Sequence, residues 1–225
     1  MDQLRAVDAL ADGWLAGILL VCTGVLAWVN LASPRQWVVL SRSFASFRLG
    51  RHRLREELNM RDRTLSGLAL MSTAVVALFA YQVLLYHGWV APGSAAFLRV
   101  LLVVAGVVLA QVLVLLALRL LPSRDGGMKE YLFTLIVFHV VLGLLLLPVT
   151  VLMSFPPNVA WREWAWLAGA AIVAATVLFR WARAVVVGVG NGTPLRYIFI
   201  YLCTLEMLPA ALALEHVSRI VPPVQ

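Results

Sequence analysis

Residues 101–118 read LLVVAGVVLAQVLVLLAL, eighteen positions in which Gln111 is the only polar side chain. A second run, residues 132–148, reads LFTLIVFHVVLGLLLLP, and its one ionisable side chain is His139. Each run approaches the length of about 20 residues that a helix needs to cross a hydrocarbon core of ~30 Å. Neither run alternates apolar and polar residues with a period of two. The sequence therefore predicts membrane-spanning helices.

Runs of this kind occur six times along the chain. Hydrophobic residues make up 62% of the 225 residues and charged residues only 13%, which is too little polar surface for a soluble domain of this size. Both cysteines, Cys22 and Cys203, lie inside apolar runs, which argues against a disulfide scaffold. We therefore predict an all-α, polytopic membrane protein with a single membrane domain over residues 1–225. Its six transmembrane helices are placed near 13–32, 66–87, 96–119, 130–153, 163–183 and 195–216.

The basic residues predict the direction in which the spans cross the membrane. The net charge is +7, and fourteen of the eighteen basic residues fall in or beside the connections 33–65, 120–129 and 184–194. Cytoplasmic loops of membrane proteins carry such an excess of arginine and lysine. We therefore predict that both termini lie outside the cytoplasm (N-out/C-out). The positive charge is attributed to topology and to anionic lipid headgroups, and no nucleic-acid partner is expected.

The connection over residues 35–63 is the longest charged stretch of the chain. Its apolar residues recur at steps of three and four, beginning with Trp37 and Leu40, which predicts a helical segment with one apolar stripe. A basic amphipathic helix of this kind lies in the cytoplasmic membrane interface. A docking surface for a cytoplasmic partner is the alternative. The side chains expected to contact headgroups or a partner are Arg42, Arg48, Arg51, Arg53 and Arg55.

The same segment contains residues 56–61, EELNMR, which match the E-E-x-x-x-R string of membrane-embedded glutamate proteases. Those enzymes also use histidines on later helices, in F-x-x-x-H and H-x-x-x-N/D patterns. Here Leu135 stands four residues before His139, where the first pattern needs phenylalanine. The four histidines of the chain also show no metal-ligand spacing. We therefore predict a protein that is not an enzyme and that uses no metal or cofactor.

Three polar side chains on three predicted spans fall at similar depth in the membrane. At a rise of 1.5 Å per residue, Glu206, His139 and Gln111 lie about 15, 13–14 and 12 Å from the predicted cytoplasmic ends of their spans. Ionisable groups at this depth are costly, so each is a candidate functional residue. The sequence predicts a buried polar site around Glu206. This site serves either as a structural link between helices or as part of a transport or proton pathway.

The residues around Glu206 favour close approach of a neighbouring helix. Cys203 lies on the same helical face as Glu206 and is small. Pro209 cannot donate a hydrogen bond to the carbonyl of Leu205, which leaves a free acceptor one residue from the carboxylate. Both features predict that Glu206 faces another part of the bundle.

Aromatic residues are expected to mark the two membrane interfaces. Trp14 and Trp28 bracket the first predicted span, as interfacial anchors do. Tyr81, Gln82 and Tyr86 lie toward the outer end of the second span, and we predict that they too are interfacial.

Residues 201–209, YLCTLEMLP, resemble the Y-L-C-x-L-E-[IM]-L-P signature of an uncharacterised bacterial family catalogued as domain of unknown function 4271. The signature groups Tyr201, Cys203, Glu206 and Pro209 on the last span. The basic stretch 47–63 also looks familial, and the resemblance covers most of the chain from about residue 35. It implies a multipass protein of the bacterial inner (cytoplasmic) membrane, and it implies no particular activity.

Two functions are compatible with these features. The first is a non-enzymatic subunit or assembly factor of a cell-envelope complex, whose partners are the lipid bilayer with its anionic headgroups and an envelope protein. The second is a small transporter or proton-coupled component that uses Glu206 with His139 and Gln111. The short outer loops and the absence of a recognisable catalytic set favour the first.

Overall fold

The computed structural model describes residues 10, 12–34, 37–38, 40–41, 63–119 and 128–190. The regular structure in these residues is helical, so the all-α prediction is confirmed for this part of the chain. Five long helices are present: α1 (Gly13–Ala32), α4 (Arg63–Tyr86), α5 (Ser94–Arg119), α6 (Met128–Ser154) and α7 (Val159–Gly190).

Each of the five helices is long and apolar enough to cross a membrane. They correspond to the first five predicted spans, and α1 has the predicted bounds. The largest difference is in α7, which begins at Val159 and continues to Gly190, beyond the predicted end at residue 183. The predicted sixth span, 195–216, lies outside the described residues. The count of six spans and the N-out/C-out orientation stay predictions.

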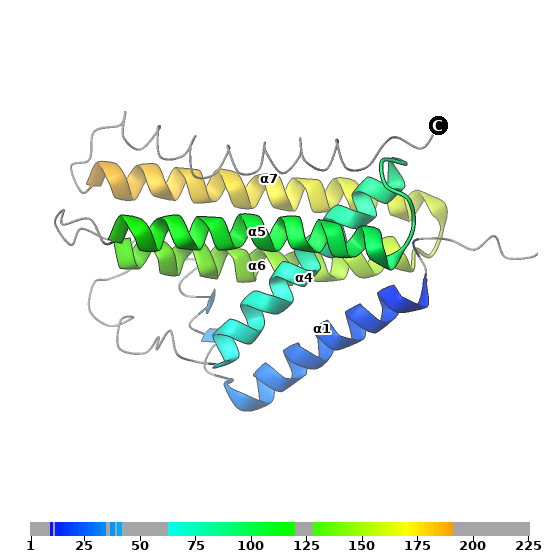
Figure 1. The fold of residues 1–225 in the computed structure, drawn as a ribbon, viewed down its shortest axis with the longest axis horizontal. Helices are drawn as coiled ribbons and strands as arrows, with labels where there is room; N and C mark the ends of the chain where they lie inside the picture. Colours follow the sequence, from blue (N-terminus) through cyan, green and yellow to red (C-terminus); the bar gives the residue numbers. More distant parts are fainter. Residues whose placement is uncertain are drawn as a thin grey trace, which may run out of the picture.

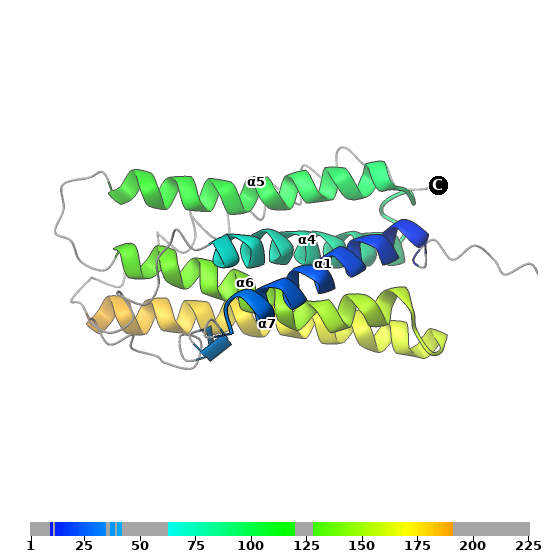
Figure 2. The same ribbon diagram turned by 90° about the horizontal axis from the view of Figure 1, so that it is seen from below.

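The helices α4 and α6 form the centre of the bundle. Helix α4 packs against α1, α5 and α6, and α6 packs in addition against α7. Figure 2 shows the resulting order α5, α4, α6, α7. In Figure 1, α5, α6 and α7 run along the long axis of the molecule, whereas α4 and α1 run obliquely to it.

The bundle is apolar on its outside and carries polar groups on its inside. Leucines on α1, α4, α5 and α7 are more than 60% exposed, among them Leu20, Leu31, Leu70, Leu102 and Leu178. In contrast, four polar side chains are fully buried: Ser72, Gln82, Thr150 and Ser154. This distribution suits a hydrocarbon solvent, because exposed leucines are stable in lipid and polar groups there need partners inside the bundle.

The connection between α4 and α5 depends on two glycines and a buried tyrosine. Gly88 and Gly93 have φ values of +71° and +143°, which favour glycine. The backbone N–H of Gly93 donates a hydrogen bond to the Tyr81 hydroxyl at 3.0 Å. The Tyr81 ring packs against Trp14 and Phe97, with centroid separations of 5.7 and 5.9 Å. Tyr81 thereby joins α1, α4 and α5 at one end of the bundle.

The prediction of interfacial positions is therefore wrong for Tyr81 and Gln82. Both side chains are 0% exposed, because neighbouring elements supply hydrogen-bond partners for the hydroxyl and the amide. Tyr86 is 39% exposed, as expected of an interfacial side chain.

Within the predicted segment 35–63 the structure describes residues 37–38, 40–41 and 63. Leu40 is 6% exposed and belongs to the core cluster that contains Cys22 of α1 and Met71 of α4. Trp37 packs against the same cluster. The first apolar residues of the predicted stripe therefore pack against other helices of the protein, whereas the sequence predicts that they contact lipid acyl chains. The predicted headgroup contacts lie outside the described residues: Arg42, Arg48, Arg51, Arg53 and Arg55.

Candidate functional site

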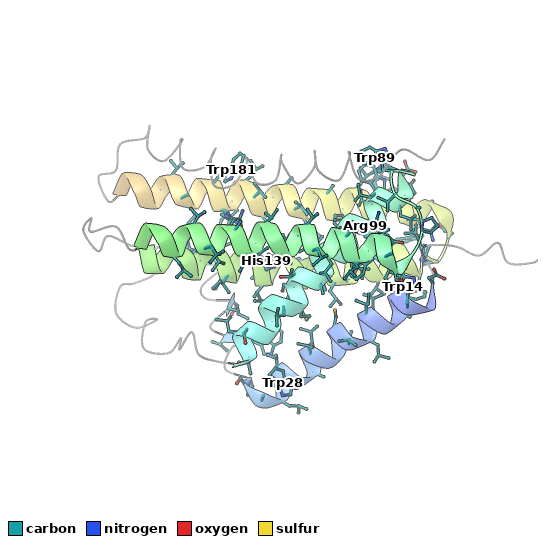
Figure 3. All side chains as sticks on the ribbon, viewed as in Figure 1. Trp14, Trp28, Trp89, Arg99, His139 and Trp181 are labelled. Atoms are coloured by element: carbon teal, nitrogen blue, oxygen red, sulfur yellow. The ribbon has the colours of Figure 1, made fainter. Side chains whose placement is uncertain are left out.

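Thr73 on α4 and His139 on α6 form a polar contact between the two central helices. The Thr73 Oγ1 and His139 Nε2 atoms are 2.9 Å apart, and Thr73 Oγ1 also donates to the Ala69 carbonyl at 2.9 Å. A threonine hydroxyl has one proton, and a carbonyl can only accept. The tautomer of His139 decides whether Nε2 donates to Thr73 or accepts its proton. Figure 3 shows His139 midway along the bundle.

The adjacent residues Ser72 on α4 and Val140 on α6 make a second link between the two helices. Ser72 Oγ donates to the Val140 carbonyl at 3.2 Å, and both residues are buried. Gly143, one turn further along α6, faces Ser72 so closely that an added Cβ would overlap both the backbone and the side chain of that serine. Small residues at a helix crossing permit this backbone approach. The α4–α6 contact is therefore a close-packed, hydrogen-bonded crossing.

A third link lies nearer the predicted outer end. The Gln82 amide nitrogen on α4 donates to the Thr150 carbonyl at 3.1 Å and to Ser154 Oγ at 2.7 Å, both on α6. A carbonyl accepts only, which fixes the orientation of the amide. The Gln82 Oε1 atom is buried, with no hydrogen-bond partner among the described residues. Pro148 has no backbone N–H and so removes one hydrogen bond from α6. Gln82 bonds to the part of α6 that follows this proline.

Two arginines near the C-terminal end of α7 place positive charge close to α6. Arg183 is 4% exposed, and its guanidinium carbon lies 5.7 Å from the centroid of the Phe138 ring on α6. Arg180, one turn earlier on α7, is half-buried and interacts electrostatically with His139. Sequence reasoning assigned both arginines to the cytoplasmic flank. Their spacing of three residues places both on one face of α7.

The structure describes two of the predicted site residues. His139 is half-buried, and its hydrogen bond goes to α4. Gln111 is half-buried on α5, a helix that packs mainly on α4 and only slightly on α6. The described geometry therefore joins His139 to Thr73. The other four predicted site residues lie outside the described residues: Tyr201, Cys203, Glu206 and Pro209.

The described residues contain no group of three or more histidine, cysteine, aspartate or glutamate side chains that could hold a metal ion. The side chains of Thr73, His139, Arg180 and Arg183 can instead donate hydrogen bonds or attract an anion. We refer to these four residues as the inner polar cluster.

A family model described as "Domain of unknown function (DUF4271)" matches residues 15–216. No curated protein and no solved structure matches the chain. The match includes the five helices and the nonamer at residues 201–209, so the family resemblance of the sequence is confirmed.

Proposed function

The chain belongs to the DUF4271 family, and we propose that it is a non-enzymatic subunit or assembly factor of a cell-envelope complex in the bacterial inner membrane. One observation carries the proposal: three polar side chains of α4 form hydrogen bonds with α6. Ser72, Thr73 and Gln82 each pair with a carbonyl or side chain of that helix. Such bonds hold a bundle together, because unsatisfied polar groups are unfavourable in hydrocarbon.

The packing between these bonds supports the same proposal. Gly143 leaves no space between α4 and α6 at Ser72, and the ring of Phe79 fills the position where Gly169 of α7 would carry a Cβ. A transport pathway needs polar groups that face a water-filled cavity or one another along a route. A tightly packed helix pair is better suited to present fixed surfaces to a partner.

The segment 35–63 is the proposed contact region on the cytoplasmic side. Its first residues are anchored, because Leu40 is buried in the core cluster and Trp37 packs against it. The arginines that follow in the sequence would then be attached to the bundle through Trp37 and Leu40. They are suited to bind anionic headgroups or an acidic surface of an envelope protein.

Purification in a mild detergent tests this proposal. We expect a protein partner to co-purify with the wild-type chain and to be lost when Arg48, Arg51, Arg53 and Arg55 are all replaced by glutamine. The matched control is Glu206→Gln, which changes charge inside the predicted last span and should retain the partner. A wild-type chain that purifies alone, or a partner retained by the fourfold variant, would contradict the proposal.

A proton-coupled component is the second candidate, and the inner polar cluster favours it. His139 is an ionisable group inside the bundle, and it lies near Arg180. In this function Glu206 would carry the proton, assisted by His139 and Gln111. The expected result is a Glu206→Gln variant that folds and assembles normally but loses a phenotype dependent on a pH gradient. A silent Glu206→Gln variant would exclude this candidate.

A further inference from the structure

The contact between α4 and α6 contains an unsatisfied hydrogen-bond acceptor near the C-terminal ends of both helices. Gln82 Oε1 is buried and has no hydrogen-bond partner among the described residues. Rotating the amide by half a turn would not satisfy it, because Oε1 would then face the Thr150 carbonyl, which can only accept. An unpaired buried acceptor is unfavourable, most of all inside a membrane. Oε1 therefore requires a donor.

The Ser154 hydroxyl on α6 is a donor beside this acceptor. Ser154 Oγ accepts the hydrogen bond from Gln82 Nε2 at 2.7 Å, so its own proton is directed away from Nε2. No acceptor for this proton is found in the part of the chain that the structure describes. The Thr150 hydroxyl differs, because it donates to the Leu147 carbonyl of its own helix at 2.7 Å.

The distance between the acceptor and the donor suits a bridging water molecule. Gln82 Oε1 and Nε2 are attached to the same carbon atom, so Oε1 lies within about 5 Å of Ser154 Oγ. A water molecule with two hydrogen bonds of ordinary length joins oxygen atoms that are up to about 5.5 Å apart. One water molecule can therefore donate to Gln82 Oε1 and accept from Ser154 Oγ.

The chemistry of the two groups also selects water over other ligands. Both side chains are 0% exposed, which leaves no access for a larger polar molecule. A calcium or magnesium ion takes six or more oxygen ligands, and the described residues contain no cluster of acidic side chains that could supply them. An anion would be repelled by the amide oxygen. Water alone among these ligands can accept one hydrogen bond and donate another.

We propose that Gln82 and Ser154 hold one buried water molecule between α4 and α6. Water molecules of this kind pair with buried polar groups that lack partners in the protein. The water completes the link that Gln82 makes to the part of α6 that follows Pro148. The proposal goes beyond the proposed function, since it concerns a ligand bound inside the chain and holds with or without a protein partner.

Nuclear magnetic resonance on the full chain in mild detergent tests the proposal. The glutamine side chains are labelled with ¹⁵N, and contacts between their NH₂ protons and water are measured in the rotating frame, where a dipolar contact and chemical exchange have opposite signs. The Gln82 resonance is identified by its loss in Gln82→Met. It should show a dipolar cross-peak with water. A folded wild-type chain without this cross-peak would overturn the proposal.

A variant of the donor tests whether Ser154 holds the water. Ser154→Cys fills the same space with a weak donor and should lose the cross-peak. Thr150→Val is the matched control, because it removes a buried hydroxyl that bonds within α6 and keeps the carbonyl to which Gln82 bonds. The control should retain the cross-peak.

A cross-peak that survives in Ser154→Cys, or that is lost equally in Thr150→Val, would contradict the assignment of the water to Gln82 and Ser154. If Ser154→Cys does not accumulate as folded protein, Ser154→Ala takes its place with the same expected loss. The wild-type measurement requires no variant of Ser154 and decides by itself whether Gln82 contacts water.

Discussion

Ser72 on α4 and Gly143 on α6 meet so closely that the glycine has no space for a Cβ, and Ser72 Oγ bonds to the Val140 carbonyl within the same contact. This crossing sets the distance between the two central helices. The links from Thr73 to His139 and from Gln82 to Thr150 and Ser154 lie on the same pair of helices. The geometry of the five described helices therefore depends on α4 and α6.

Replacing Gly143 by alanine should destabilise the protein, because the new methyl group overlaps Ser72. The expected loss in the free energy of unfolding is roughly 1–3 kcal/mol. The loss in stability is measured by thermal unfolding in detergent, in which the disappearance of the monodisperse peak in size-exclusion chromatography reports unfolding. Gly106→Ala on α5 is the control, since an added Cβ there meets nothing within 4 Å. Equal midpoints for the two variants would show that the α4–α6 crossing is looser than described.

Gln82→Leu should also destabilise the bundle, because it removes two hydrogen bonds between α4 and α6. Interhelical hydrogen bonds in membranes contribute about 0.5–2 kcal/mol, so a loss of this size is expected. Ser154→Ala should cost less, since Gln82 keeps its bond to the Thr150 carbonyl. In a double-mutant cycle the two changes should be less than additive. Strict additivity would mean that Gln82 and Ser154 do not interact.

Tyr81→Phe should weaken the end of the bundle where α4 turns into α5. The variant keeps the ring contacts but leaves the N–H of Gly93 without its acceptor. The expected cost is about 1 kcal/mol, the size of one hydrogen bond. Amide hydrogen exchange at residues 87–93 should increase locally. Tyr86→Phe, at a 39% exposed tyrosine, should leave the same exchange rates unchanged, and the same increase in both variants would refute the assigned role.

Reporter fusions test the predicted N-out/C-out orientation. A fluorescent protein fused at the C-terminus should stay dark in cells, whereas alkaline phosphatase at the same place should be active. A fluorescent protein fused after Arg124, in the predicted cytoplasmic connection 120–129, should mature and provide the control. Fluorescence of the C-terminal fusion would reverse the orientation or require an odd number of spans.

The positions of the helices were predictable from the sequence because continuous apolar runs of membrane length have few alternative structures. The bounds of α1 agree with the prediction. The ends of α7 were placed less well, since arginines and glycines after residue 180 suggested that the span stops there. The helix continues to Gly190.

The pairing of polar side chains could not be predicted in the same way, because it depends on which helices become neighbours. The position of Gln82 near the end of a span predicts an interfacial side chain, yet the side chain is fully buried and bonds to α6. Arg183 is one of the basic residues that the charge pattern assigns to a cytoplasmic flank, yet its guanidinium packs against Phe138. The sequence singles out His139 as a polar group on its span, but it does not identify Thr73, which pairs with the ring in the structure.

The central claim is that the buried polar groups hold the bundle together and do not conduct protons. Flux measurement tests it most directly. The purified protein is reconstituted in liposomes that contain a pH-sensitive dye, and a potassium diffusion potential is applied with valinomycin. The account predicts the same internal pH trace as in protein-free liposomes, with a protonophore added at the end as the positive control. A proton flux that is abolished by Glu206→Gln would contradict the account.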